Sequence, residues 1–259
     1  MSDLCCVESG RALRSIAEIP YERIVAERVR GDPLLFYALA SASFAEITSD
    51  LYTRNLLAFF TEDADVAAWL EGEWQREELQ HGAVLKRYVR TVWPEFDWDR
   101  VYRRFVAEFS QYCTVDQLAQ THALEMAARC VIETGTASFY RMISEMSPEP
   151  VLRQIAAAIS ADEVRHYKHF YRYFLRYRER ERTERSAVLS TLLMRVAEID
   201  AEDAFCAFKH VFLARNRTAE FCRRDYRAFR TGLRRRARSN FPHGMAATQP
   251  STLLPPARC

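Results

Sequence analysis

Two copies of a Glu-x-x-His motif are the residues of this chain with the clearest capacity for chemistry. Glu78 and His81 form the first copy, and Glu163 and His166 form the second. Residues three apart on an α-helix lie on one face, so each copy offers a carboxylate and an imidazole to the same metal ion. A single copy is weak evidence in a chain with 28% charged residues, because such pairs commonly lie on helix surfaces.

One further glutamate precedes each motif by the length of a helix and a turn. Glu46 stands 32 residues before Glu78, and Glu133 stands 30 residues before Glu163. A chain that runs up one helix, turns and returns reaches the same height after about this many residues. Two helices that give one Glu each and two that give Glu-x-x-His each are the ligand pattern of di-iron carboxylate proteins.

The pattern predicts a buried centre of two iron ions, with manganese as an alternative. Four carboxylates largely neutralise two Fe(II), while two imidazoles and open positions leave room for O2. The competing interpretation is that the same residues form scattered salt bridges. The predicted metal ligands are Glu46, Glu78, His81, Glu133, Glu163 and His166.

The elements that position these residues are predicted to be helices. Only 7 Gly and 9 Pro occur among 259 residues, whereas a β-sandwich or barrel needs many turn residues. Asp32 and Pro33 are an N-cap and a first helical residue, and Pro94 stops a later helix. We expect helices over residues 33–60, 63–92, 97–111, 115–146, 184–198 and 201–236, a short leading helix over 20–30, and a long helix that opens at Pro148 or Pro150 and passes Phe174.

This element order predicts an all-α, ferritin-like four-helix bundle with additional C-terminal helices. The helical domain is expected to span residues 20–238, between a flexible N-terminus over 1–19 and a disordered tail over 239–259. The expected caps of later helices are Asp63 or Asp65, Thr114 and Asp200.

Net charge and cysteine content indicate which partners and which cellular compartment to expect. The net charge is only +2, so nucleic acid is not an expected partner, although arginines cluster over residues 176–185 and 223–238. Seven cysteines form an odd set without a C-x-x-C pair, and the first residues lack the apolar run of a signal peptide. A cytoplasmic protein is therefore expected, and no apolar stretch reaches the 18 residues of a membrane span.

The residues that flank both motifs resemble those of a known family. The segment from Trp74 to Tyr88 resembles the W-x-x-E-E-x-x-H-G-x-x-L-x-x-Y segment of soluble acyl-carrier-protein desaturases, and Ile159 to His166 resembles their I-x-A-D-E-x-R-H motif. The similarity covers about residues 33–180. It is weak around Glu46, and the C-terminal helices are hard to align.

The resemblance implies an O2-dependent oxidase that acts on an unactivated C–H bond. Family members desaturate fatty acyl chains on an acidic carrier protein and receive electrons from ferredoxin, so a carrier protein or a small molecule, a ferredoxin-like donor and a second copy of the chain are the implied partners. A Thr three residues after the third-helix Glu lies beside the O2 site in that family, and Thr136 occupies this position. A hydroxyl bonded to a carbonyl of its own helix is an equally good account of Thr136.

Two alternatives to the oxidase remain at this stage. One is iron storage or peroxide reduction in the manner of ferritins and rubrerythrins, although the extra C-terminal helices and the missing C-x-x-C pair count against it. The other is an interaction scaffold that a metal merely stabilises.

The sequence also predicts the surroundings of the metal. We expect Asp162 to reach the ring nitrogen of His81 that faces away from the metal, and Glu77 to do the same for His166. A desaturase needs a narrow apolar tunnel, with His169 at its mouth or as an ordinary core residue. The expected tunnel walls are Leu85, Phe139, Phe170 and Phe174, which would otherwise be plain core.

Overall fold

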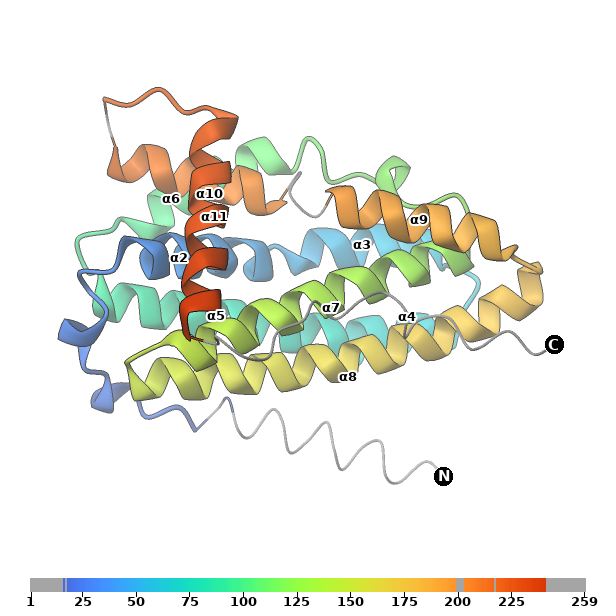
Figure 1. Cartoon of the computed structure of the whole chain (residues 1–259). Helices are drawn as coiled ribbons and strands as arrows, with labels where there is room; N and C mark the ends of the chain where they lie inside the picture. The colour runs from blue at the N-terminus through green and yellow to red at the C-terminus, as the bar shows by residue number, and fades with distance from the viewer. Residues whose placement is uncertain (1–15, 17, 199–202, 217, 241–259) are drawn as a thin grey trace.

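The computed structural model describes residues 16, 18–198, 203–216 and 218–240, and within these ranges the chain is helical and forms no β-strand (Figure 1). The predicted all-α class is therefore confirmed. Asp200 and nearly all of both terminal segments lie outside the described residues. Two single turns of 3₁₀-helix, Tyr21–Arg23 and Ala26–Arg28, replace the expected leading helix.

The first long helical run is interrupted, although one helix over residues 33–60 was predicted. Helix α2 covers Pro33–Ile47 and α3 covers Ser49–Phe59. Asp32 caps α2 as expected, through side-chain bonds to two backbone N–H groups. The interruption falls at Thr48, whose hydroxyl donates to the carbonyls of Phe44 and Ala45 and competes with regular helix bonding.

The next run carries the first motif. Asp63 caps α4, which covers Ala64–Trp69 and leads through one π-helical turn, Leu70–Trp74, into α5 over Gln75–Val92. Pro94 lies just beyond the end of α5, because its ring cannot continue a helix. The expected connecting helix is α6, which covers Trp98–Phe109 and is capped by Asp97.

The start of the third ligand-bearing helix differs from the prediction. Thr114 precedes only a 3₁₀ turn over Val115–Gln117, and the long helix α7 spans His122–Met146 with Thr121 as its cap. Several residues can cap a helix in this segment, so the sequence alone did not select the correct one.

Helix α8 spans Pro150–Glu181, with Pro150 at its first position. The side chain of Glu149 accepts bonds from the N–H groups of Val151 and Leu152. Helix α9 covers Arg185–Glu198, close to the predicted bounds. The single helix predicted over residues 201–236 is two helices, α10 over Asp203–Arg215 and α11 over Arg223–Asn240.

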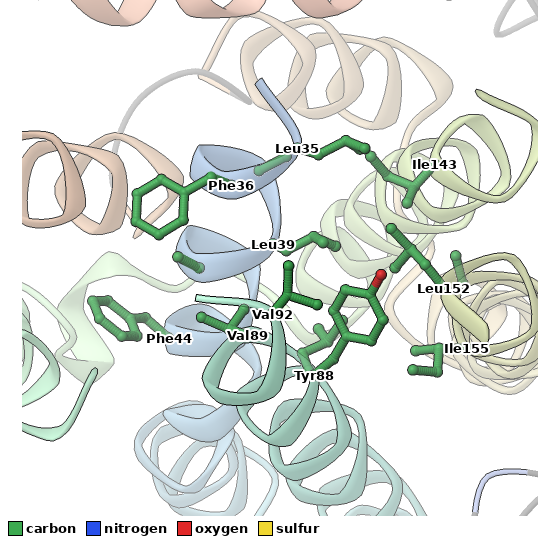
Figure 2. Packing of buried hydrophobic residues seen from close by; sticks show 14 of the residues in the cluster. Leu35, Phe36, Leu39, Phe44, Tyr88, Val89, Val92, Ile143, Leu152 and Ile155 are labelled. Carbon is green, nitrogen blue, oxygen red and sulfur yellow. The ribbon is translucent and has the colours of Figure 1, made fainter. Parts of the chain in front are cut away.

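Helices α2, α5, α7 and α8 pack together around the motif residues, and α7 with α8 form the most extensive contact. Helices α10 and α11 lie over one side of this group, where α11 crosses α2 and α7 (Figure 1). Tyr88, Ile143 and Leu152 meet in the larger apolar cluster, together with side chains from α2 (Figure 2). No helix in the described ranges is both long and apolar enough to cross a membrane.

Two apolar clusters enclose a polar layer. Leu85 of α5, beyond the first motif, belongs to the larger cluster, whereas Trp74, in the π-helical turn before α5, belongs to the smaller cluster. Along α8 the order is reversed, with Ile159 in the larger cluster and Phe170 in the smaller. The motif residues therefore lie between two apolar layers, where unpaired charge is costly.

Candidate metal centre

The structure brings all six residues of the predicted ligand set into this buried layer. Helix α2 supplies one glutamate and α7 another, while α5 and α8 each supply a glutamate and a histidine. The most exposed member, Glu78, has only 9% of its surface accessible. The layer consists of Glu46, Glu78, His81, Glu133, Glu163 and His166.

The six side chains form two overlapping groups that could each hold a metal ion. One group joins Glu46 and His81 to a shared pair of glutamates, and the other joins Glu133 and His166 to the same pair. The shared residues are Glu78 and Glu163, and the potential ligand atoms of each group lie within 4.8 Å of one another. Two adjacent ions with bridging carboxylates are the arrangement that these groups fit.

One ring nitrogen of each histidine and several carboxylate oxygens at the centre lack hydrogen-bond partners among the described residues. His81 Nδ1 lies 3.2 Å from Glu163 Oε1, and His166 Nδ1 lies 3.1 Å from Glu78 Oε1, but neither nitrogen makes an aligned bond. One oxygen each of Glu46, Glu133 and Glu163 is also buried without a partner among the described residues. Buried polar atoms are normally satisfied, so this convergence of unsatisfied ligand atoms fits a bound cation.

The opposite nitrogen of each histidine is held by an acid, as the sequence predicted. His81 Nε2 lies 3.1 Å from Asp162 Oδ2, and His166 Nε2 lies 2.8 Å from Glu77 Oε2. Each acid immediately precedes the motif glutamate of the other helix. These bonds fix the rings so that both Nδ1 atoms point into the cluster.

Arg165 joins the two supporting acids. Its Nη2 donates to both oxygens of Glu77 at 2.8 and 2.9 Å, and its Nη1 donates to Asp162. A continuous chain of bonds therefore runs from one histidine to the other behind the cluster. Sequence reasoning gave Arg165 no role, although it stands inside the second motif.

The charges of the cluster conflict when only protein groups are considered. Burial and the neighbouring charges of Glu163 and Glu46 raise the pKa of Glu78 well above its usual range. Burial raises the pKa of Glu133 to about 8. Burial also opposes ionisation of Glu163, but the neighbouring imidazoles of His166 and His81 outweigh it and lower the pKa of Glu163. Divalent cations would relieve the conflict by neutralising the carboxylates.

Two hydroxyl groups from α7 contact the carboxylates. Thr136 Oγ1 lies 3.0 Å from Glu163 Oε2, and equally close to the carbonyl of Ile132 in its own helix. The hydroxyl is therefore bonded within its own helix, as one interpretation of Thr136 expected, and it also contacts a predicted ligand. The phenol of Tyr140 donates a short bond to Glu46. Tyr140 was missed, although it lies seven residues after Glu133 and therefore on the same face of α7.

A cavity of about 470 Å³ adjoins the cluster. Glu46, Thr136 and Tyr140 belong to its wall. Residues of α2, α3, α6, α7 and the C-terminal helices α9, α10 and α11 also contribute to the wall. Its volume is in the range of small-molecule sites. The wall also includes Tyr112, which is 56% exposed, and the exposed Gln117, so this end of the cavity reaches the surface.

The walls of the cavity differ from those predicted for a tunnel. Phe139 lines it, but Leu85, Phe170 and Phe174 belong to the apolar clusters. The difference arises because α10 and α11 cover the α2–α7 side, a placement that the sequence did not reveal. His169 is not part of the wall, and its ring stacks on Trp69 with 4.9 Å between centroids.

No family model, curated protein or solved structure matches the chain. The fold and the site by themselves define a general class, an all-helical protein with buried Glu and His groups that could hold metal ions.

Proposed function

We propose that this protein is a ferritin-like di-iron oxidase that uses O2 to attack an unactivated C–H bond of a substrate held in the cavity. The observation that carries the proposal is the juxtaposition of the ligand cluster and the cavity, which share Glu46 in their walls. A metal that only stabilised the fold would not need a chamber at its side.

The ligand set suits iron. Four carboxylates and two imidazoles are hard and intermediate donors, which favour Fe or Mn over the metals that thiolates select. When bound, the iron ions would supply the electrons that reduce O2 and the oxidising power that removes hydrogen from the substrate. Glu78 and Glu163 belong to both groups, so both would help to hold either ion.

The overall reaction can take two balanced forms. Desaturation removes two hydrogen atoms from adjacent carbons, and O2 with two further electrons and two protons becomes two molecules of water. Hydroxylation inserts one oxygen atom into the C–H bond, and the other oxygen leaves as water after it takes up two electrons and two protons. Both forms need an external reductant, for which a ferredoxin-like protein is the expected donor.

The protein's own part is to position groups and exclude water. Thr136 presents a hydroxyl to Glu163 at the boundary between cluster and cavity, where it can donate or accept a proton. Tyr140 holds Glu46 in place through its phenol. The resemblance of both motifs to acyl-carrier-protein desaturases favours a fatty acyl chain as substrate and desaturation as the reaction.

Iron storage and peroxide reduction are the alternative functions. They need a short polar path for ions or peroxide, whereas the wall of this cavity includes apolar side chains such as Ala38, Phe139 and Leu233. This wall favours the oxidase. Assembly into a large cage that oxidises Fe(II) without consuming any organic substrate would favour storage instead.

Metal analysis tests the proposal most directly. After anaerobic loading with Fe(II), we expect two irons per chain and Mössbauer spectra of a coupled pair. Glu133→Ala or His166→Ala should retain one iron or none, because each ion needs its own imidazole and carboxylates. Glu145→Ala, on the same helix as Glu133 but outside the cluster, is the matched control and should keep both irons.

Turnover completes the test. Reduced protein is supplied with O2 and a fatty acyl chain, either as the free acid or as an acyl-carrier-protein thioester, and products are identified by mass spectrometry. Loss of two hydrogens or gain of one oxygen is the expected result. Full iron occupancy in both ligand variants, or a chain that binds no iron, would refute the proposed centre.

A further inference from the structure

The end of the cavity near its exposed residues contains a buried guanidinium. Arg129 on α7 is only 6% exposed, yet it lines the cavity together with Tyr52 and Asn55 of α3. From this placement we infer that Arg129 binds the carboxylate of an amphipathic substrate whose apolar part extends past the metal cluster. The inference deepens the proposed function and depends on it.

The bonding of Arg129 leaves its terminal nitrogens available. Its Nε donates to Glu125 at 2.7 Å, and its carbon Cζ lies 5.8 Å from the ring centroid of Tyr52. Within the described ranges, neither Nη group donates a hydrogen bond to another residue. Glu125 in turn is fully buried and accepts a bond from the N–H of Ala119, which fixes the guanidinium in place.

A carboxylate is the anion that this arrangement fits best. The paired Nη groups of arginine match the two oxygens of a carboxylate. Glu125 already balances the charge of Arg129, so a doubly charged phosphate would be more difficult to accommodate than a single carboxylate. The other charged groups in the cavity wall are Glu46, Arg195, Asp203 and Arg230, and Asp203 accepts a bond from Tyr52.

The position of Arg129 along α7 sets the distance between a bound carboxylate and the part of the substrate beside the cluster. Arg129, Ile132, Thr136 and Phe139 line the cavity at helical spacing, so they form one stripe along the helix. Seven residues separate Arg129 from Thr136, which corresponds to about 10 Å along the helix axis. A carboxylate at Arg129 thus places a carbon about that far along the chain beside the cluster.

The part of the wall beyond the cluster is mainly apolar. Ala38 and Ala42 of α2, Phe139 of α7, and Phe229 and Leu233 of α11 line it, and Arg230 is the charged residue of this stretch of α11. A hydrocarbon tail would gain burial in this region, whereas a charged group would lose hydration. The chamber therefore fits a fatty acid with its head group near the entrance. This differs from a carrier-bound thioester, which has no charge at that carbon.

Binding of octanoate and of its uncharged analogue octanamide tests the inference on full-length, iron-loaded protein under anaerobic conditions. Isothermal titration calorimetry should show octanoate bound about 10- to 100-fold more tightly, the usual advantage of a charged hydrogen-bond pair. The double variant Glu125→Gln/Arg129→Gln removes the whole ion pair and leaves neither charge buried alone. In this variant the ratio of octanoate affinity to octanamide affinity should fall to about one. Octanamide affinity and iron content should remain unchanged.

Two further variants keep the test decisive. Arg141→Gln/Glu145→Gln removes an ion pair of the same spacing on the exposed side of α7 and should keep the full preference for octanoate. Arg129→Lys preserves the positive charge but not the paired Nη groups that match two carboxylate oxygens. The preference for octanoate over octanamide should therefore fall several-fold without loss of the fold.

The possible failures are distinguishable. Equal affinity for octanoate and octanamide in the wild type, an unchanged preference after loss of Arg129, or binding only of the acyl-carrier-protein thioester would overturn the carboxylate site while leaving the di-iron proposal intact. A chain without iron would overturn the proposed function even if octanoate binding depended on Arg129.

Discussion

Replacement of Gly82 by alanine should disturb the metal centre more than it disturbs the fold. Gly82 follows His81 on α5 at the point where this helix meets α2. A Cβ atom at Gly82 would stand 2.3 Å from Cγ1 of Ile47 and 2.7 Å from the Ile47 backbone nitrogen. The side chain can rotate away, but the backbone nitrogen can retreat only if α2 moves, and Glu46 moves with it.

The size of the displacement follows from these contacts. The nitrogen must move from 2.7 Å to the ordinary contact distance of about 3.4 Å, a retreat of about 0.7 Å. Ligand distances in metal sites normally lie within about 0.2 Å of their usual values, so a shift of this size would misplace Glu46 for an ion bound at the cluster. Overpacking costs about 1–3 kcal/mol, and the better helix propensity of alanine offsets about 1 kcal/mol of that. The net loss of stability is therefore about 0–2 kcal/mol.

Iron titration and urea unfolding measure the two effects separately. We expect Gly82→Ala to weaken one of the two proposed iron sites at least about tenfold. Adding Ile47→Ala to Gly82→Ala should restore iron affinity only in part, because the new Cβ atom still meets the backbone nitrogen of residue 47. Gly72→Ala is the matched control, since nothing lies within 4 Å of its Cβ position, and it should keep full iron affinity. Wild-type iron affinity in Gly82→Ala would refute the reasoning, whatever the change in stability.

Three other changes test separate parts of the structure. Asp162→Asn should lower iron affinity about 10- to 100-fold with little loss of helix content, because the ring of His81 loses its charged support; unchanged affinity in an iron titration would contradict this role. Thr136→Val should change stability by less than about 1 kcal/mol, since the side chains have similar shapes, yet reduce the product formed per O2 consumed; unchanged coupling would remove Thr136 from the reaction. Burial opposes ionisation of Asp63, but hydrogen bonds from Tyr177 and from the backbone N–H of Val66 outweigh it and lower the pKa of Asp63. The ionised carboxylate therefore stabilises the fold at pH values above 3.8, the ordinary pKa of the group, and this stabilisation is lost as the pH falls below that value. In urea unfolding, Asp63→Asn should thus cost about 1 kcal/mol at neutral pH and progressively less under acid conditions, and a pH-independent difference would count against this assignment.

The cluster was predictable because its signal is local and repeated. Glu78 and His81 must share a helix face whatever the rest of the fold does, and the spacing from Glu46 follows from the length of a helical hairpin. The supporting roles of Asp162 and Glu77 followed from the symmetry of the two motifs. Tyr140 and Arg165 show that the same periodicity contained more information than was used.

The helix ends and the cavity were less predictable, for physical reasons. The break at Thr48 depends on hydroxyl bonds to nearby carbonyls, a competition that similar residues inside helices do not always win. The break between α10 and α11 lacks a proline or glycine to mark it, since residues 216–222 contain neither. The cavity depends on how these late helices fold back across α2 and α7, which is a long-range property.

The crossed support of the two histidines has a consequence for how this sequence can change over evolution. Asp162 and Glu77 each hold the ring that belongs to the other motif, and Arg165 is bonded to both acids. A substitution in one motif therefore damages the other, and the damage can be repaired at a position more than eighty residues away in the chain. The two motifs should therefore change together, and a lineage that alters one member should retain the altered form only with a compensating change in the other.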